Sequence, residues 1–240
     1  MTRKPPTLAL IASVLLWLGL TAIPATAIRL VTPEPAIDAP IPEEAFARYA
    51  GLNTSLTEEG YPMLGDPDAP FIIEDFSSFA CPFCRDFHEE TFPGVLELIE
   101  EGQVAFVYVP IYITGSLPNN QNANLAAICA AEQDTFWPYL DMLYDWHTRF
   151  GQTAFIDERL EQGAVNLGLD MQQWQTCLAD DAGTQLLEDA VEMMRRRGYG
   201  GTPTLVINGE RVAATLDAIL DFIDGQDGES THINPSASQI

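Results

Sequence analysis

The sequence predicts an α/β fold, a layered core of sheet and helices that is interrupted midway by a block of helices. The order of predicted elements along the 240 residues is strand, helix, strand, helical block, strand hairpin and helix. At this length, a hydrophobic content of 47% is enough for one domain with its own hydrophobic core, or for one domain that carries an insertion.

Local patterns place the first elements. The apolar run of residues 71–76 predicts a buried strand, and the aromatic and β-branched run of residues 104–113 predicts a second one. Between them, residues 85–101 carry apolar residues at helical spacing, and Pro93 is expected to kink this helix. The stretch from Pro62 to Pro70 is rich in turn residues.

From residue 119 onwards the spacing of apolar residues becomes helical. We expect helices around Ala126 and Ala127 and over residues 137–150, 156–167, 171–178 and 186–197, with Trp137, Trp146 and Trp174 in their core. Residues 204–207 and 210–212 flank the turn pair Asn208-Gly209 and predict a hairpin, and residues 216–223 predict a closing helix. The core domain is therefore expected over residues 61–118 and 199–225, with the helical insertion over 119–198.

The two ends of the chain show patterns of their own. Arg3 and Lys4, the apolar run Leu8–Ile23 and the small residues Ala25-Thr26-Ala27 predict a signal peptide over residues 1–27, or an N-terminal anchor if it is not cleaved. Residues 28–60 are expected to be a proline-rich linker and N-terminal extension. Residues 226–240 are expected to be a disordered tail.

The charge balance excludes some classes of partner. The formal net charge is −24, and Lys4 is the single lysine of the chain. A nucleic-acid-binding protein needs a basic surface, so we expect no nucleic-acid partner. Export would place the cysteines in a compartment where disulfides persist.

Cys81-Pro82-Phe83-Cys84 allows a metal site, a structural staple or a reactive dithiol. A structural zinc site needs about four ligands, and no second pair of cysteines is present, although His88 leaves a three-ligand site open. The dithiol has a physical rationale: Cys81 follows a strand and starts a helix, as Pro82 at an early helical position indicates. Free N–H groups at a helix N-terminus stabilise a thiolate, which favours Cys81 as the nucleophile and Cys84, one turn further on, as the resolving cysteine.

Phenylalanines flank the dithiol in the sequence. Phe79, Phe83 and Phe87 are expected to surround it with apolar surface suited to unfolded polypeptide, although core packing is an alternative role, especially for Phe87. Cys129 and Cys177 both fall in predicted helices of the insertion. In an exported protein we expect them to form a structural disulfide, with two buried thiols as the alternative.

Several motifs resemble the DsbA-like thiol–disulfide oxidoreductases of the thioredoxin superfamily. They are residues 64–70 (LGDPDAP), 74–77 (EDFS), 81–84 (CPFC), 126–133 with Phe136-Trp137, and 201–204 (GTPT), and the resemblance covers roughly residues 61–225. It implies a thioredoxin-like fold, a central mixed sheet flanked by helices, with an inserted helical subdomain.

The resemblance also assigns roles to residues. It implies that Pro203 is the cis-proline beside the active site and that the Thr202 backbone binds substrate. Asp75 stands where the family often has a buried glutamate that transfers protons, and Glu74 is the alternative candidate for this role. Phe83 stands where the strong oxidants of the family carry a histidine.

These observations together predict an exported oxidase that introduces disulfides into polypeptide thiols through Cys81 and Cys84, without bound cofactor or metal. The resemblance implies a quinone-linked membrane protein as the redox partner, and membrane contact is expected only through residues 8–23 if the N-terminal segment is not cleaved. A reductase or isomerase with the same site, or a metal-binding or chaperone-like module, is the alternative function. Arg195-Arg196-Arg197 is expected to complement a helix C-terminus, or else to contact an acidic or membrane partner near Pro203.

Overall fold

The computed structural model describes residues 37–230, and side chains up to residue 226. The predicted signal peptide or anchor (residues 1–27) and the tail beyond residue 230 lie outside the described residues. Among residues 37–230, no helix is both long enough and apolar enough to cross a membrane.

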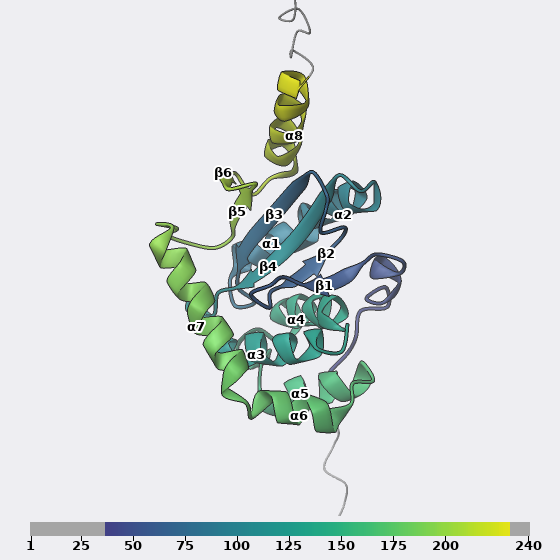
Figure 1. Cartoon of the computed structure of the whole chain (residues 1–240). Helices are drawn as coiled ribbons and strands as arrows, with labels where there is room; N and C mark the ends of the chain where they lie inside the picture. The colour runs from purple at the N-terminus through teal and green to yellow at the C-terminus, as the bar shows by residue number, and fades with distance from the viewer. Residues whose placement is uncertain (1–36, 231–240) are drawn as a thin grey trace, which may run out of the picture. The chain divides into compact units, whose positions relative to one another are not determined.

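A six-stranded mixed sheet forms the centre of the domain (Figure 1). Its spatial order is β1-β2-β4-β3-β5-β6, and only β3 and β4 run parallel to each other. The strands are β1 (Thr54–Leu56), β2 (Pro62–Leu64), β3 (Phe71–Ser77), β4 (Val104–Pro110), β5 (Thr204–Ile207) and β6 (Glu210–Val212).

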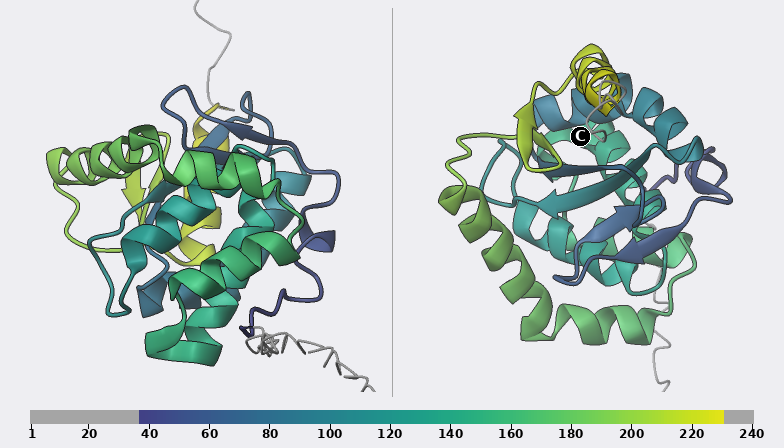
Figure 2. Two further views of the ribbon diagram at one scale, coloured as in Figure 1. Left: turned by 90° about the horizontal axis from the view of Figure 1, so that it is seen from below. Right: turned by 45° about the horizontal axis from the view of Figure 1, so that its top comes forward.

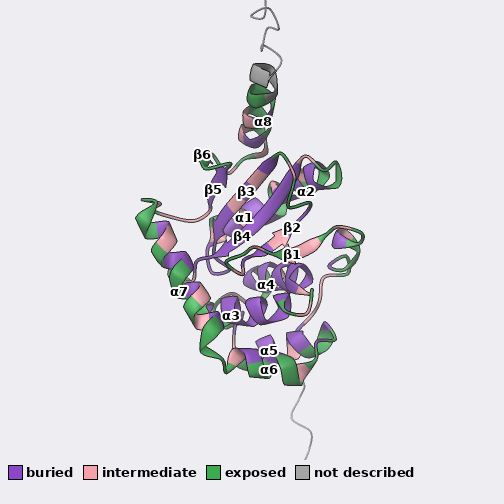
Figure 3. Ribbon diagram, in the orientation of Figure 1, coloured by how far each residue is buried: buried purple, intermediate pink, exposed green. Residues whose placement is uncertain are grey.

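The two central strands are largely buried because helices cover both of their faces. Every residue of β4 is buried, and only Ile72 and Glu74 of β3 are half-buried (Figure 3). Side chains alternate between the faces of a strand. Consequently Ile73, Asp75 and Ser77 of β3 share one face, while Glu74 and Phe76 share the other.

The helices cover the two faces unequally. The helices are α1 (Pro82–Glu90), α2 (Phe92–Glu100), α3 (Asn120–Ala131), α4 (Phe136–Phe150), α5 (Asp157–Asn166), α6 (Met171–Leu178), α7 (Asp181–Arg196) and α8 (Leu216–Ser230). One core joins the Ile73 face to α1, α2, α3 and α4. A smaller core joins Phe76 to Ala190, Val191 and Met194 of α7. The face that carries Asp75 is therefore the one covered by α1.

The helical insertion between β4 and β5 consists of α3 to α7. Figures 1 and 2 show α3, α4, α5 and α6 grouped at one end of the sheet, with α8 beyond the opposite end. Trp137, Trp146 and Trp174 are at most 3% exposed, as expected for its core. A disulfide joins Cys129 of α3 to Cys177 of α6, with both residues buried.

The mixed sheet flanked by helices, with its extra helical region, confirms the predicted fold class. The sequence interpretation was wrong in several local details. The helix expected over residues 85–101 is two helices, α1 and α2, and they part at Thr91 rather than kink at Pro93, because Pro93 lies in the first turn of α2, where its missing N–H costs nothing.

Other boundaries differ as well. The segments that contain β1 and β2 were expected to be extension and turn, but they pair with each other and with β4. Three-residue strands are too short to produce a readable alternation. The second strand ends at Pro110 rather than at residue 113, and α8 continues through Gly225 to Ser230.

Residues 37–40, at the start of the described chain, are bound to the insertion. Three consecutive backbone carbonyls, those of Asp38, Ala39 and Pro40, accept hydrogen bonds from Arg159 Nε, Asn166 Nδ2 and Trp146 Nε1 at 2.7–2.8 Å. This part of the predicted linker is thus fastened to α4 and α5.

Candidate active site around Cys81 and Cys84

Cys81 lies at the start of α1, directly after the chain leaves the C-terminal end of β3. It is the N-cap residue of the helix, Pro82 follows in the first turn, and both Cys81 and Cys84 are free thiols. The residues Phe83 and Cys84 belong to the first turn of this helix, and their backbone N–H groups favour the charged form of Cys81. Proline fits the first helical turn because it has no N–H to leave unpaired there.

The Cys81 thiol is strongly acidic in this environment. Its pKa falls from 9.0 to about 5, mainly because the Cys84 thiol donates a hydrogen bond to its sulfur. The Thr202 side chain and the N–H groups of Cys84 and Phe83 lower the pKa further, while burial opposes them. At pH 7 the thiolate would outnumber the thiol by roughly a hundredfold.

Cys84 and Asp75 lie deeper than Cys81. Burial raises the pKa of Cys84 far above its ordinary value, and its hydrogen bond to Cys81 adds to the shift. Burial also raises the pKa of Asp75 from 3.8 to about 8, while a hydrogen bond from Ser77 opposes the shift. Asp75 is 3% exposed, and its Oδ1 has no hydrogen-bond partner. At neutral pH, Asp75 therefore holds a proton beneath the dithiol.

The loop before β5 brings Thr202 and Pro203 to Cys81. Strand β5 pairs antiparallel with β3, with Thr204 opposite Phe76, so the residues before Thr204 emerge at the end of β3 from which the chain runs to Cys81. The peptide bond between Thr202 and Pro203 is cis. The carbonyl oxygen of Thr202 lies 3.3 Å from Cys81 Sγ and accepts a hydrogen bond from the thiol form. The thiolate cannot donate to it, so its stabilising contacts are the donors named above.

The three phenylalanines expected around the dithiol have different roles. Phe83 is 70% exposed, the highest value among the large apolar residues of the described chain, and it stands beside Cys81. Phe79 is fully buried, stacks on Tyr108 and packs at a tilt against Tyr144, and Phe87 is buried against Phe106. Only Phe83 can present apolar surface to a polypeptide, and the other two belong to the core.

Glu74, the alternative candidate for proton transfer, lies on the other face of β3 from Asp75. Its carboxylate binds Arg197 at 2.7 Å, and the Arg197 guanidinium also stands over the Phe76 ring. Arg196 pairs with Glu192 one turn earlier in α7. Glu74 is thus not available beneath the dithiol, and two of the three arginines at the end of α7 have acidic partners.

The structure adds residues that the sequence did not single out. Tyr144 Oη lies 3.3 Å from Ser77 Oγ on the Asp75 face of the sheet, and His147 Nδ1 binds the Phe79 carbonyl oxygen at 2.7 Å. These contacts join residues 67 and 68 positions apart, so no local pattern could indicate them. Through them α4 holds the segment that leads into Cys81.

His88, considered above as a metal ligand, is bound to an aspartate of α4. It is 7% exposed, and its Nε2 lies 2.8 Å from Asp141 Oδ1 on α4, which also accepts from Tyr49 and Arg48. In the described part of the chain, no cluster of three or more histidine, cysteine or acidic side chains could hold a metal ion.

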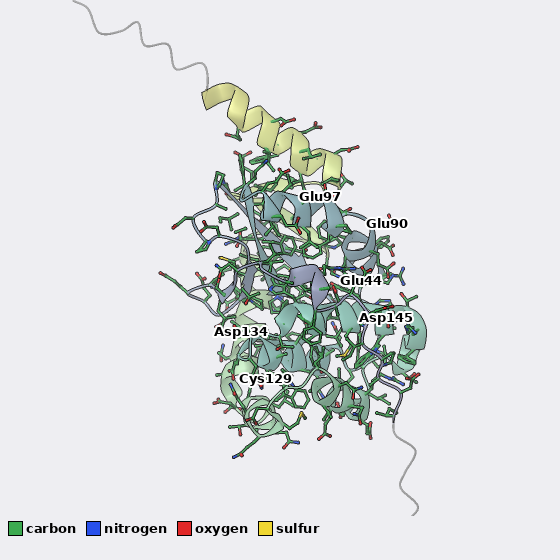
Figure 4. All side chains as sticks on the ribbon, turned by 90° about the vertical axis from the view of Figure 1, so that its right-hand side faces the viewer. Glu44, Glu90, Glu97, Cys129, Asp134 and Asp145 are labelled. Carbon is green, nitrogen blue, oxygen red and sulfur yellow. A yellow bond between two sulfur atoms is a disulfide. The ribbon has the colours of Figure 1, made fainter. Side chains whose placement is uncertain are left out.

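The protein carries many acidic side chains. Figure 4 shows Glu44, Glu90, Glu97 and Asp145 on one side of the molecule, and Glu90 belongs to the helix that Cys81 begins. Arg85, one turn into α1, is paired with Asp86 at 2.5 Å. The chain as a whole has 11 basic and 35 acidic residues. Substrates therefore approach a protein of strongly negative net charge.

Comparisons with known proteins agree with this geometry. The family described as Thioredoxin matches residues 57–225. Disulfide bond formation protein D of Bacillus subtilis is 23% identical over 184 residues, which are 69% of this chain and 77% of that protein. The chain is also 30% identical over 148 residues to the Na(+)/H(+) antiporter NhaA 3 of Salinispora tropica, but it spans only 21% of that antiporter's length.

Solved structures show the same fold. Oxidised BdbD from Bacillus subtilis superimposes with a TM-score of 0.60 at 22% identity, over 72% of this chain and 98% of that one. MdbA, a thiol-disulfide oxidoreductase from Corynebacterium diphtheriae, gives a TM-score of 0.58 at 20% identity, over 72% and 92% of the two chains.

Proposed function

Since this chain belongs to the thioredoxin family, among its DsbA-like thiol–disulfide oxidoreductases, we propose that it is an exported oxidase that introduces disulfides into polypeptides through Cys81 and Cys84. The asymmetry of the two thiols carries the proposal. One sulfur is acidic at a helix N-terminus, and the other is buried with a raised pKa. Stabilising the Cys81 thiolate stabilises the reduced protein, which makes its disulfide a stronger oxidant.

The first step forms a mixed disulfide. A substrate thiolate attacks Cys81 Sγ, the Cys81–Cys84 bond breaks, and its electron pair goes to Cys84 Sγ. Because Asp75 is protonated at pH 7 and lies below the pair, it supplies the proton that the poorly acidic Cys84 needs as it leaves. Asp75 then recovers a proton from solvent.

The second step releases the product. A second thiolate of the same polypeptide attacks the substrate sulfur of the mixed disulfide, and Cys81 leaves as a thiolate. Its pKa of about 5 makes it a good leaving group. Two electrons have then passed from the substrate dithiol to the protein, which holds Cys81 and Cys84 in reduced form.

Polypeptide substrates fit the surface around Cys81. Exposed Phe83 offers an apolar contact, and the backbone of Thr202 precedes β5, whose ladder with β3 begins at Thr204. An extended substrate segment can add along Thr202 as a further strand while its thiol meets Cys81.

Repeated turnover needs an oxidant for the reduced protein. We propose a quinone-linked membrane protein as this partner and the cell envelope as the location, on the basis of the N-terminal signal or anchor pattern and the family. Membrane vesicles with quinone should reoxidise the dithiol, and vesicles stripped of quinone should not. Reoxidation at equal rates by both preparations would rule out this partner.

Trapping of mixed disulfides tests the assignment of the two cysteines. Cys84→Ser leaves Cys81 without its resolving thiol and should accumulate mixed disulfides with a reduced and partly oxidised substrate polypeptide, as seen on non-reducing gels. Cys81→Ser, which makes the same chemical change at the nucleophile and leaves only the buried Cys84 thiol, should trap none. Equal trapping by both variants would refute the roles proposed here.

A further inference from the structure

The loop between β4 and α3 (residues 111–119) is fastened to the segment that leads into Cys81. Ser78 Oγ donates to the Thr114 carbonyl oxygen at 2.9 Å, and Asn120 Nδ2 reaches both of these groups, at 3.0 Å from Ser78 Oγ and 3.2 Å from Thr114 O. Ser116 N–H donates to the Ala80 carbonyl oxygen at 3.0 Å. Thr114 is therefore held at a set distance from the start of α1.

Gly115 makes this close approach possible. Its φ is +94°, in the region that favours glycine, and a Cβ there would lie 2.3 Å from the backbone carbonyl group of Ala80. Two segments about 35 positions apart thus meet backbone to backbone beside the cysteine. A loop with this contact has little freedom to shift.

The Thr114 side chain points at Thr202. Thr114 Oγ1 lies 2.8 Å from Thr202 Oγ1, while the Thr202 carbonyl oxygen lies 3.3 Å from Cys81 Sγ. A hydroxyl group has one proton to donate and can accept at its lone pairs. If Thr202 donates its proton to Cys81, the bond between the two threonines requires Thr114 to donate to Thr202.

The charge of Cys81 decides which of the two threonine hydroxyl groups donates in the hydrogen bond between them. When Cys81 is a thiol, its proton satisfies the Thr202 carbonyl, and the Thr202 hydroxyl is free to donate to Thr114. When Cys81 is a thiolate, it can only accept, and a Thr202 hydroxyl that donates to sulfur must accept its bond from Thr114, which then donates. Consecutive hydrogen bonds of this kind polarise and strengthen each other.

We propose that Thr114 is a positioning residue of the dithiol, whose hydroxyl holds the Thr202 hydroxyl in the orientation that donates to the Cys81 thiolate. The inference deepens the proposed function and rests on it, because the thiolate is the species that the exchange reaction uses. Thr202 lowers the pKa of Cys81, which fits such a contact. Thr114 acts only through Thr202.

Titration of the Cys81 thiolate tests the inference. The reduced full chain is titrated by its thiolate absorbance, and alkylation by iodoacetamide is followed at pH 5. Thr114→Val keeps the shape of the side chain and removes the hydroxyl, so the pKa of Cys81 should rise by about 0.5–1 unit, with a roughly twofold to fivefold slower alkylation. Thr114→Ser keeps the hydroxyl and should stay close to wild type.

A double-mutant cycle separates positioning from a general structural effect. Thr202→Val should raise the pKa of Cys81 by itself, and Thr114→Val should add less than about 0.2 units in that background. Thr176→Val, which removes an exposed hydroxyl bonded only to the Gln172 carbonyl oxygen of α6, should change nothing.

Two results would overturn the inference: an unchanged pKa in Thr114→Val, or the same shift in the presence and absence of the Thr202 hydroxyl. If Thr114→Val folds poorly, the Thr202→Val and Thr114→Ser proteins still test the inference. It requires a raised pKa of Cys81 in Thr202→Val and a wild-type pKa of Cys81 in Thr114→Ser. Failure of the proposed function is a separate result, namely that wild-type protein does not exchange disulfides with a reduced polypeptide.

Discussion

Replacing Asp75 with asparagine should reverse the pH dependence of the stability of the reduced protein. Folding raises the pKa of Asp75 from 3.8 to about 8. Between these values the folded protein holds one proton more than the unfolded chain at this residue, so the carboxyl group makes the free energy of unfolding fall as pH rises. Asparagine resembles the protonated carboxyl group and removes this term.

Cys81 has the opposite effect on the pH dependence of the free energy of unfolding. Its pKa is about 5 in the folded protein and 9.0 ordinarily, so the unfolded chain holds more protons between pH 5 and 9, and stability rises with pH. One fully shifted group changes the free energy of unfolding by about 1.4 kcal/mol per pH unit. Cys81 is 5% exposed but starts α1 beside exposed Phe83, and screening by solvent there narrows its pKa shift, so the slope that it contributes, averaged over pH 5–8, should be roughly 0.7 kcal/mol per unit.

The opposite contributions of Asp75 and Cys81 give each variant its own curve of unfolding free energy against pH between pH 5 and 8. Wild type should lose about 0.7 kcal/mol per pH unit, Asp75→Asn should gain about 0.7, and Cys81→Ser should lose about 1.4. Asp75→Asn should therefore gain about 4 kcal/mol relative to wild type over these three units. Asp68→Asn, at an exposed turn, is the matched control and should run parallel to wild type.

Urea unfolding of the reduced proteins at pH 5, 6, 7 and 8 measures these differences, with mass spectrometry verifying that the Cys129–Cys177 disulfide stays intact. Parallel curves for wild type and Asp75→Asn would refute the reasoning, because they would mean that Asp75 has the same pKa in the folded and unfolded chain.

Three further outcomes are expected. Replacing Cys129 and Cys177 with alanine opens a loop of sequence separation 48 and should lower the free energy of unfolding by at most about 4 kcal/mol while exchange persists; loss of exchange in a folded variant would contradict a purely structural role. Arg159→Leu should lower the free energy of unfolding by about 2 kcal/mol and speed amide exchange after Asp38, whereas Arg149→Leu, at an exposed ion pair, should have little effect; equal losses would argue against the fastening of residues 37–40. Cationic peptides should react faster than anionic ones at low ionic strength, and salt should remove the difference; a preference unaffected by salt would exclude the acidic surface as its cause.

The sequence revealed those parts of the site that are local in the chain. Cys81, Pro82 and Cys84 follow a strand and begin a helix, and this placement favours a reactive dithiol over a metal site or a structural disulfide. The strand alternation that separates Asp75 from Glu74 was also readable in principle. Choosing between them required knowing which face α1 covers, and only the packing of α1 and α7 on the sheet decides that.

Contacts between distant segments could not be predicted. Thr114 reaches Thr202 across 88 positions, and neither residue belongs to a pattern that names the other. The short strands β1 and β2 were missed for a related reason, because pairing partners rather than their own residues make them strands. Phe79, Phe83 and Phe87 share one spacing pattern, yet burial assigns only Phe83 to the surface.

The equilibrium redox potential of Cys81–Cys84 tests most directly the claim that the acidic Cys81 makes this protein an oxidant. Equilibration with glutathione buffers, followed by alkylation and mass spectrometry of the pair, gives its value. The stabilised thiolate predicts a potential less negative than about −200 mV, in the range of disulfide-donating proteins. A value near about −270 mV, as for thioredoxin itself, would contradict the oxidase proposal and identify the site as a reductant.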